Sequence, residues 1–357
     1  MNLFSQGVDP SVNFAIGAIY SRKMPAETPA LLGGDTMAIY LSEADVREIL
    51  TMEIALKAVE DSFQMLADGS ASQHPRQRLN PAANSYLHYM AAADSREHYM
   101  GLKIYTSSPQ GLKFIVPLFH TESGDLLAMI EANYLGQMRT GAASGVATRL
   151  MARADAKTVG IIGTGLQSHT QLQAIALVRK IKSIRAFGRN EERRTKFARD
   201  VTERLKIPVE AAHSPEAAIR DADIIITSTN ATKPVLEGRW LRPGTHINAI
   251  GANFPQKREL DSDAVARANI IAADSREQSK LEAGDLIQAF AGDEQKWSQV
   301  RELSEIAAGR TPGRTNSSEI TLFKSNGVAI EDIVTAGRIY EIAREKKRGI
   351  ELPFWKQ

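Results

Sequence analysis

The stretch "TVGIIGTGLQSHTQLQAI" (158–175) organises the interpretation of the whole sequence. It joins an apolar β-branched run to a helical pattern through glycines and a serine at the G-x-G-x-x-small spacing. In such loops the first glycine permits a tight turn, the second admits a pyrophosphate, and the small third residue lets the helix pack on the strand. We therefore predict a dinucleotide-binding loop, with an incidental glycine turn as the alternative, made of Gly163, Thr164, Gly165, Leu166, Gln167 and Ser168.

Apolar runs and helical patterns alternate after this loop. Such alternation is typical of a parallel sheet that is covered by helices on both faces. We expect helices from Ser168 to about Arg179 and near 191–205, and strands in "TVGII" (158–162), "SIRAF" (183–187), "DIIITST" (223–229), "HINAIG" (246–251) and "NIIAAD" (269–274).

The part before the loop follows a different pattern. Ser42 with Asp45, and Thr51 further on, are expected N-caps of two helices, and Gly69 is an expected stop. Short β-like runs separated by turn residues then predict an antiparallel block: "YLHYM" (86–90), "LKIYT" (102–106), "LKFIVPLFH" (112–120) and "LLAMI" (126–130).

Two helices are expected to pack closely on other elements. The segment 131–156 contains a cluster of small residues at 141–147 that allows another backbone to approach. The segment 317–350 contains a helix with an apolar stripe near Ile330 to Ile342, which needs a partner surface.

Composition excludes several classes of protein. With 357 residues the chain is long enough for two domains, and its 44 basic and 42 acidic residues are interspersed, which does not favour nucleic acid as a partner. It has no cysteine, which excludes disulfides and thiolate chemistry, and no apolar run long enough to span a membrane. Residues 1–36 do not resemble a secretory signal and are expected to be a flexible extension, so we expect a cytoplasmic protein.

The end of the second predicted strand bears on the type of dinucleotide. The fingerprint expects an acidic residue there to hold the ribose hydroxyls. The sequence instead reads "AFGRNEERR" (186–194), with Gly188 at that place and Arg189 next to it. We expect NADP(H) to be preferred, with NAD(H) possible, and the 2′-phosphate to be held by Arg189 with Asn190 and Arg193 or Arg194.

Several motifs together resemble the ornithine cyclodeaminase and mu-crystallin family. The resemblance runs from about Ala38 to Leu352, in the family's order and spacing. It is carried by "QHPRQRL" (73–79), "GLKIYT" (101–106), "QMRTGAASGVATRLMAR" (137–153), "GIIGTGLQSHTQLQA" (160–174), "DIIITSTNATKPVL" (223–236), "INAIGANFPQKREL" (247–260) and "FKSNGVAIEDIVTAGRIYE" (323–341).

The resemblance implies an α/β fold with a Rossmann dinucleotide-binding domain and an α+β domain for substrate binding and dimerisation. It implies a homodimer in which the antiparallel sheet lies at the interface. The expected limits are 37–140 with 321–357 for the substrate-binding domain and 141–320 for the Rossmann domain. Further cofactor-binding residues are expected in the matching loops: Thr227, Ser228, Thr229, Ile250, Gly251, Lys257, Ser325, Asn326 and Gly327.

Matching motifs also select Arg76, Lys103 and Arg139 as the residues that would hold the carboxylate of an amino or imino acid. An arginine fork matches a carboxylate, and a lysine among apolar strand neighbours is costly unless it faces an anion or a cavity. We expect Lys103 also to exchange a proton with the substrate nitrogen, since nearby cations would lower its pKa. Arg78 is an alternative to Arg76. The seven histidines show no metal-ligand spacing, so no metal is expected.

Asn253 separates the possible activities. In cyclodeaminases of this family the matching stretch carries an aspartate, and an asparagine cannot accept a proton near neutral pH. We therefore expect Asn253 and Lys103 at the catalytic centre of an NAD(P)H-dependent reductase of Δ1-pyrroline-2-carboxylate or Δ1-piperideine-2-carboxylate that yields an L-amino acid. The alternatives are an ornithine cyclodeaminase, an alanine dehydrogenase, and a mu-crystallin-like protein that binds NADPH or another ligand.

Overall fold

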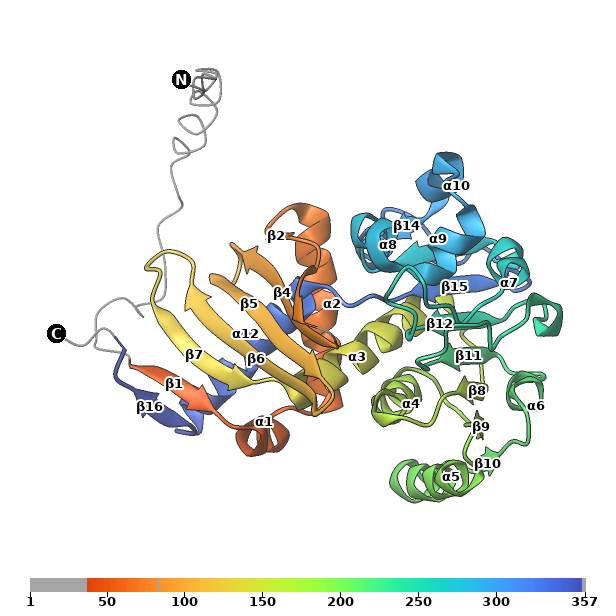
Figure 1. The fold of residues 1–357 in the computed structure, drawn as a ribbon, viewed down its shortest axis with the longest axis horizontal. Coiled ribbons are helices and arrows are strands. Elements are labelled where there is room, and N and C mark those ends of the chain that lie inside the picture. The colour runs from red at the N-terminus through yellow and green to blue at the C-terminus, as the bar shows by residue number, and fades with distance from the viewer. Residues whose placement is uncertain (1–36, 83, 355–357) are drawn as a thin grey trace. The chain divides into compact units, whose positions relative to one another are not determined.

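The structure is a computed structural model that describes residues 37–354 apart from residue 83. The predicted extension, residues 1–36, lies outside the described residues, as do residues 355–357. The described residues form two eight-stranded sheets, each with its own set of helices (Figure 1).

The first sheet is almost entirely antiparallel; only β1 and β7 pair in parallel. Its order is β16-β1-β7-β6-β5-β4-β2, and β3 pairs with β4. This confirms the predicted antiparallel block and adds strands that were not predicted. Its strands are β1 (Ala38–Leu41), β2 (Ala71–Gln73), β3 (Gln77–Ala82), β4 (Ser85–Asp94), β5 (Tyr99–Ser108), β6 (Gly111–His120), β7 (Leu126–Glu131) and β16 (Ile350–Leu352).

Local signals set the limits of the first helices, as predicted. Ser42 and Asp45 form a reciprocal capping box at the start of α1, and Thr51 caps α2. Gly69 ends α2 with a φ of 80°, a left-handed conformation that glycine adopts without strain. The helices associated with this sheet are α1 (Glu43–Ile49), α2 (Met52–Asp68), α3 (Asn133–Met151) and α12 (Ala329–Glu345).

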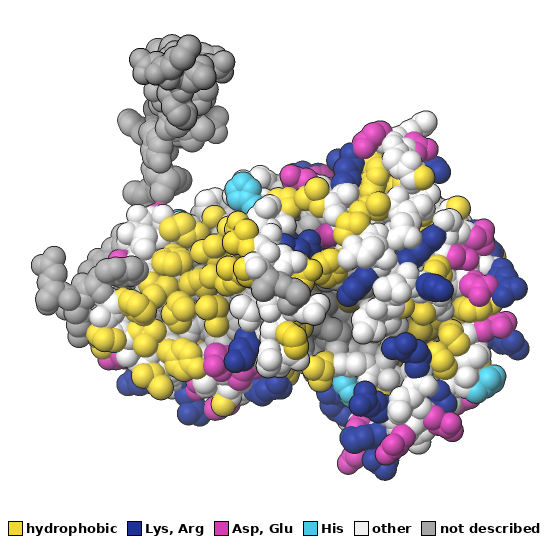
Figure 2. Space-filling view, viewed as in Figure 1, with side chains coloured by type: hydrophobic (Ala, Val, Ile, Leu, Met, Phe, Trp, Pro, Cys, Tyr) yellow, Lys and Arg dark blue, Asp and Glu magenta, His cyan; other side chains and the backbone are white. Residues whose placement is uncertain are grey.

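The two faces of the first sheet have different neighbours. Along β4 the alternate residues His88, Met90 and Ala92 are buried, and α12 packs against β4 and β5 on this inner face. The apolar residues predicted for the terminal helix, including Ile330, are buried there. The other face carries many exposed hydrophobic side chains (Figure 2).

The second sheet is parallel throughout, in the order β10-β9-β8-β11-β12-β15-β13-β14. Helices cover both of its faces, with α4 and α5 on one side and α6 and α7 on the other (Figure 1). The predicted doubly covered sheet is confirmed. Its strands are β8 (Thr158–Ile162), β9 (Ser183–Phe187), β10 (Val209–Ala211), β11 (Ile224–Thr227), β12 (His246–Ala249), β13 (Ile270–Ala273), β14 (Arg301–Glu302) and β15 (Thr321–Lys324).

The remaining helices are short apart from α4 and α5. In the described part of the chain, none is long and apolar enough to cross a membrane. They are α4 (Leu166–Val178), α5 (Glu191–Leu205), α6 (Pro215–Ile219), the 3₁₀ turn η2 (Gly238–Trp240), α7 (Ser262–Arg267), α8 (Arg276–Glu282), α9 (Gly284–Phe290), α10 (Glu294–Gln299) and α11 (Leu303–Ala307).

The position of β15 corrects the predicted domain limit at residue 321. That limit assigned Thr321–Lys324 to the substrate-binding domain, but β15 pairs with β12 and β13 inside the second sheet. All four of its residues are buried, as is usual for a central parallel strand. The chain therefore returns to the first sheet only after residue 324, at the turn that leads into α12.

Helix α3 joins the two parts, because it packs on α2 and also on α4. The predicted small-residue cluster makes this possible. A Cβ atom at Gly141 would lie 2.5 Å from the backbone oxygen of Thr170, and one at Gly145 would lie 3.1 Å from the Cβ of Ala174. Helix α4, which begins in the glycine loop, is thereby fixed against the helix that carries Arg139.

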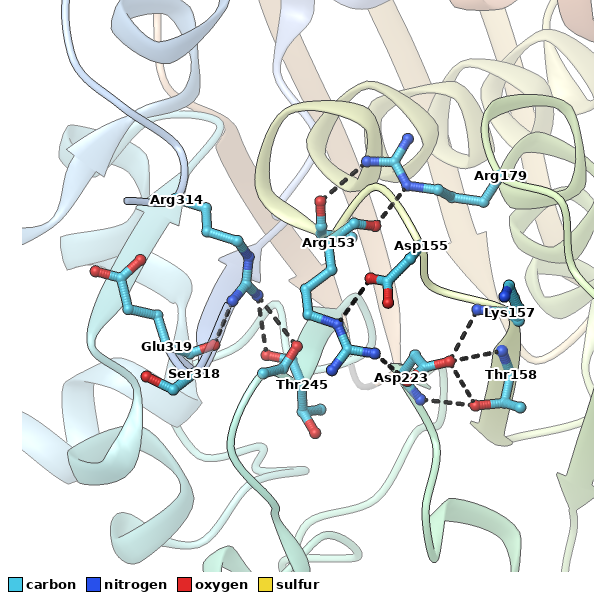
Figure 3. A network of polar contacts seen from close by, with 12 residues as sticks. Arg153, Asp155, Lys157, Thr158, Arg179, Asp223, Thr245, Arg314, Ser318 and Glu319 are labelled. Atoms are coloured by element: carbon cyan, nitrogen blue, oxygen red, sulfur yellow. Dashed lines mark hydrogen bonds and ion pairs between the residues drawn. The ribbon is translucent and has the colours of Figure 1, made fainter. Parts of the chain in front are cut away.

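A polar network holds the amino ends of the central strands of the second sheet (Figure 3). Asp223 accepts hydrogen bonds from the backbone N–H groups of Lys157 (2.8 Å) and Thr158 (3.0 Å), and it pairs with Arg153 (2.7 Å). Arg179 donates in turn to the backbone oxygen of Arg153 (3.0 Å). These contacts lie at the strand ends opposite to the glycine loop, so we interpret the network as structural.

Candidate active site

A cavity of about 970 Å³ lies between the first sheet and the carboxyl ends of the parallel strands. Binding sites of open α/β sheets occur at this edge. The substrate-facing wall comprises inner-face residues of the first sheet and residues of α3: Arg76, Tyr86, His88, Lys103, Tyr105, Ser107, Phe114, Asn133, Gly136, Gln137, Arg139 and Thr140. The opposite wall comprises Gly165, Leu166, Gln167, Ser228, Thr229, Asn230, Ile250, Gly251, Asn253, Phe254, Lys257, Ser325, Asn326 and Gly327.

The glycine loop has the geometry that the sequence predicted. Gly163 has a φ of 116°, and a Cβ atom there would lie 2.2 Å from the backbone oxygen of Ser228. Gly165 is the N-cap of α4, where no side chain caps the helix, and a Cβ atom at Gly165 would meet nothing within 4 Å. Ser168 donates from its hydroxyl to the Gly163 oxygen (2.9 Å). The loop thus offers free amide N–H groups and open space, which suits a pyrophosphate.

The structure places the residues expected at a 2′-phosphate in different environments. Arg189 is exposed and has no hydrogen-bond or ion-pair partner among the described residues, whereas Arg194 is buried and donates to the Gly188 oxygen (2.9 Å). The Asn190 side chain caps α5 by accepting from the N–H of Arg193. Of the arginines of this group, Arg189 and Arg193 are therefore exposed and available to an anion, whereas Arg194 is not.

Two buried carboxylates hold the loops at the carboxyl ends of the strands, and the sequence analysis missed both. Glu259 accepts from the hydroxyl of Thr227 (2.9 Å) and from the N–H groups of Thr229 (2.5 Å) and Gly251 (2.7 Å). Thr227, predicted as a cofactor residue, thus points into the protein and does not line the cavity.

Asp274 is the second buried carboxylate, and it accepts hydrogen bonds from the turn after β15. It accepts from the Ser325 hydroxyl (3.1 Å) and from the N–H groups of Asn326 (2.7 Å) and Gly327 (2.6 Å). Burial raises the pKa of Asp274, against the effect of these hydrogen bonds. A single carboxyl group therefore accepts three hydrogen bonds from this turn.

Lys103 and Arg139 lie side by side in a buried ion cluster. Both bind Asp332, through Lys103 Nζ (2.7 Å) and Arg139 Nε (3.1 Å), and Arg139 Nη1 donates to Glu331 (2.8 Å). The four side chains come from β5, α3 and the first turn of α12, and each is at least nine-tenths buried. Both cations were predicted from the sequence, but neither of their carboxylate partners was.

Burial changes the protonation of this cluster. It lowers the pKa of Lys103 to about 8, assisted by the neighbouring Arg139 charge and opposed by Asp332. Burial also raises the pKa of Glu331 to about 8, although Arg139 opposes this shift. Burial thus disfavours the charged forms of both Lys103 and Glu331, and Asp332 is the carboxylate that both cations share.

Arg76, the third predicted cation, is held by a different carboxylate. Glu282 pairs with Arg76 and also with Arg78, and Arg76 Nη2 donates to the backbone oxygens of Asn326 (2.9 Å) and Gly327 (3.0 Å). Arg76 lines the cavity, whereas Arg78 stacks over Phe254. The Nε atom of Arg76 has no hydrogen-bond partner among the described residues.

Asn253 lies on the opposite wall from this cationic group, in the loop after β12. The structure thus brings all the predicted substrate-binding and catalytic residues to one cavity. It also places His88 there, which the sequence analysis had grouped with ordinary histidines. Within the described residues, no group of three His, Cys, Asp or Glu side chains is placed to hold a metal ion.

Comparisons with known proteins identify the family. The family model for the ornithine cyclodeaminase/mu-crystallin family matches residues 36–347. The chain belongs to this family. It is 40% identical over 263 residues to a Delta(1)-pyrroline-2-carboxylate reductase from Bacillus cereus, which covers 71% of this chain and 81% of that protein.

Solved structures agree with this membership. The Delta(1)-pyrroline-2-carboxylate reductase of Thermococcus litoralis, in complex with NADH and L-proline, matches with a TM-score of 0.84 and 35% identity, over 88% of this chain and 100% of that one. A dimeric archaeal alanine dehydrogenase with bound NAD matches with a TM-score of 0.83 and 32% identity, over 89% of this chain and 99% of that one. The predicted family and fold class are confirmed, and the predicted activity agrees with the names of the two reductases.

The open space at Gly165 generates a test of dinucleotide binding. In Gly165→Ala we expect at least about tenfold weaker binding of NADPH, because the added methyl group contacts no protein atom and meets only a pyrophosphate that approaches the backbone. Fluorescence titration measures the affinity, and the thermal unfolding midpoint should stay unchanged. Leu177→Ala, an exposed change on the same helix, is the control. Equal affinity for Gly165→Ala and the wild type would contradict this role.

Proposed function

We propose that this protein is an NAD(P)H-dependent reductase of a cyclic ketimine that carries a carboxylate on the imine carbon, such as Δ1-pyrroline-2-carboxylate or Δ1-piperideine-2-carboxylate. The product is an L-amino acid such as proline or pipecolate. The observation that carries this proposal is the buried pair of Lys103 and Arg139, which faces the same cavity as the glycine loop. The names of the relatives support the same reaction.

Charge favours a carboxylate at this pair. The two cations share the Asp332 carboxylate, and burial disfavours the charged form of Glu331, so little negative charge of the protein is available to balance them. A substrate carboxylate supplies the missing negative charge, and it would bind where few water molecules screen the attraction. Arg76 lines the same cavity.

The bound dinucleotide supplies hydride to the imine carbon; Gly165, Leu166 and Gln167 would hold its pyrophosphate, and Lys257 and the Ser325–Gly327 turn would border its nicotinamide. The protein's own contribution is to orient the substrate, to exclude water and to provide a proton. Lys103 is the proton donor to the imine nitrogen. Its pKa of about 8 keeps it charged at neutral pH but allows it to release a proton more easily than an ordinary lysine.

Asn253 distinguishes this reaction from cyclodeamination. A reductase needs cations that bind the substrate carboxylate, a hydride donor and a proton donor. A cyclodeaminase also needs a group that accepts protons during loss of ammonia. The amide of Asn253 cannot fill that role. The alternatives therefore rank below imine reduction but remain distinguishable by assay.

A panel of substrates tests the proposal with purified full-length protein. Oxidation of NADPH and NADH is followed by absorbance with cyclic ketimines and with pyruvate plus ammonia or amines. Formation of proline and ammonia from ornithine is measured directly, in the presence of the oxidised cofactors, because cyclodeamination has no net cofactor turnover. We expect ketimine reduction to be the fastest reaction. Dominant ornithine-dependent formation of proline would instead identify a cyclodeaminase, and ammonia-dependent reduction of pyruvate an alanine dehydrogenase. Binding of NADPH without reduction of any ketimine would indicate a binding protein.

The pH dependence tests Lys103. We expect kcat to fall as pH rises through about 8, because the protonated form of Lys103 is the donor. In Asp332→Asn the fall should move to lower pH, since the Asp332 charge raises the Lys103 pKa. Lys103→Met should lower kcat by about 10²–10⁴-fold. Each profile is measured with the same ketimine, so titration of the substrate contributes equally. A basic limb that stays in place in Asp332→Asn would contradict this role.

We also propose a preference for NADP(H), supported by the absence of an acid at the end of β9 and by the unpaired Arg189. Arg189→Ala should weaken NADPH binding by about tenfold or more, with little effect on NADH, because only NADPH has a 2′-phosphate. Fluorescence titrations with both cofactors measure this difference, and Arg199→Ala, an exposed change on α5, is the control. Tighter binding of NADH than of NADPH by the wild type would contradict the preference.

We propose finally that the protein is a homodimer that pairs through the outer face of the first sheet. That face is strongly hydrophobic (Figure 2) and includes the exposed Leu87 and Ile115 and the apolar hollow around Leu102 and Phe119. Exposed apolar surface of this kind marks interaction sites. The dimeric alanine dehydrogenase supports this assembly, which analytical ultracentrifugation can check.

A further inference from the structure

Three ring side chains form a row on the inner face of the first sheet. His88, Tyr105 and Phe114 lie opposite one another on β4, β5 and β6. The His88 and Tyr105 rings are stacked with centroids 4.2 Å apart at 1°, and the Tyr105 and Phe114 rings are 4.7 Å apart. All three line the cavity beside Lys103. The mechanism proposed above uses none of them.

His88 has a buried nitrogen that is not used. Its Nε2 atom shares a 2.9 Å hydrogen bond with the Ser107 hydroxyl, but its Nδ1 atom has no hydrogen-bond partner among the described residues. The residue is only 3% exposed. Burial, with the nearby charges of Arg78 and Arg76, lowers the His88 pKa to about 4, so the ring is neutral at the pH of the reaction. Buried polar atoms in proteins are almost always paired, so an unpaired one at a cavity wall points to a ligand or water.

The spacing along β5 separates His88 from Lys103, one of the two cations that would bind the substrate carboxylate. Lys103 and Tyr105 are successive inward residues on this strand, about 7 Å apart. His88 lies opposite Tyr105 in the strand register. In a five-membered ring, a carboxylate on one carbon and a hydroxyl on a carbon across the ring have their oxygen atoms about 5 Å apart, so the hydroxyl lies on the side of the ring remote from the cations that hold the carboxylate.

We propose that His88, supported by Ser107, forms a second recognition point for an uncharged hydrogen-bonding group, such as a hydroxyl, on the ring carbon remote from the substrate carboxylate. This inference rests on the proposed function, because Lys103 and Arg139 must hold the carboxylate for the far side of the ring to reach His88. The charged groups that influence His88 are Arg76, Arg78 and Glu282, and these are paired with one another. A second carboxylate would therefore find no free cation there, whereas a hydroxyl can donate to or accept from a neutral imidazole.

The experiment compares Δ1-pyrroline-2-carboxylate with its 4-hydroxy derivative. For the wild type we expect kcat/KM to be at least about tenfold higher for the hydroxylated ring, since a polar site rejects substrates that leave its groups unpaired. His88→Phe keeps a stacking ring but removes both nitrogens, and the ratio of the two kcat/KM values should fall at least about tenfold. Ser107→Ala, which removes the partner of Nε2, should lower the ratio less.

His213→Phe, a change at an exposed histidine, is the matched control and should keep the wild-type ratio. A ratio near one in the wild type, or a ratio that survives in His88→Phe, would overturn the proposal. So would a preference for a ring with a second carboxylate. Thermal unfolding shows whether each variant is folded.

A binding measurement separates this proposal from the proposed function. L-proline and 4-hydroxy-L-proline are titrated into the protein with bound NADPH, and cofactor fluorescence reports the affinity. Failure to reduce either ketimine would refute the reductase assignment. Tighter binding of 4-hydroxy-L-proline that is lost in His88→Phe would still support the recognition point, and equal binding of the two amino acids would overturn it.

Discussion

The buried contact between Asp332 and the two cations Lys103 and Arg139 is the interaction on which the site depends. Burial of either cation without a carboxylate beside it would cost free energy. The first turn of α12 supplies Asp332 only because this helix returns to the first sheet after the chain has completed the second. Since α3 also packs on α4, the same cluster fixes the distance between the substrate clamp and the glycine loop. Substrate and cofactor geometry are therefore set together.

On the opposite wall of the cavity, buried carboxylates are again paired, but with backbone N–H groups and hydroxyls in place of cations. Glu259 and Asp274 are buried carboxylates whose oxygens collect N–H groups and hydroxyls from loops that line the cavity. Unpaired N–H groups would be costly at these positions, so the loops have few alternative arrangements. A site that is fixed before the ligands bind loses less entropy on binding and keeps the hydride donor aligned with the imine.

The features that were predicted from the sequence depend on residues close together in the chain. The capping box at Ser42, the stop at Gly69 and the glycine loop are of this kind, and family motifs added the cations. The carboxylate partners were missed because they lie far away: Glu282 is 206 residues from Arg76. Asp332 was missed because the helix that contains it was interpreted from its apolar stripe alone. The strand β15 was missed because Thr321 and Lys324 leave only two apolar residues in it, too short a run to mark a buried strand, although all four residues are buried.

Asn253 shows how the reaction can be separated from the fold. Its loop is positioned through other groups: Arg78 donates to its backbone oxygen (3.2 Å), Glu259 holds the neighbouring Gly251, and Asp285 accepts the N–H of Glu259 (2.7 Å). None of these contacts uses the Asn253 side chain, so an acid at this position would leave the loop in place. The clamp at Lys103 would also be unchanged. Under the proposed function, a single side chain that the fold does not require would determine whether the cavity holds a proton acceptor beside the bound carboxylate and the hydride donor, and with it which reactions the cavity would support.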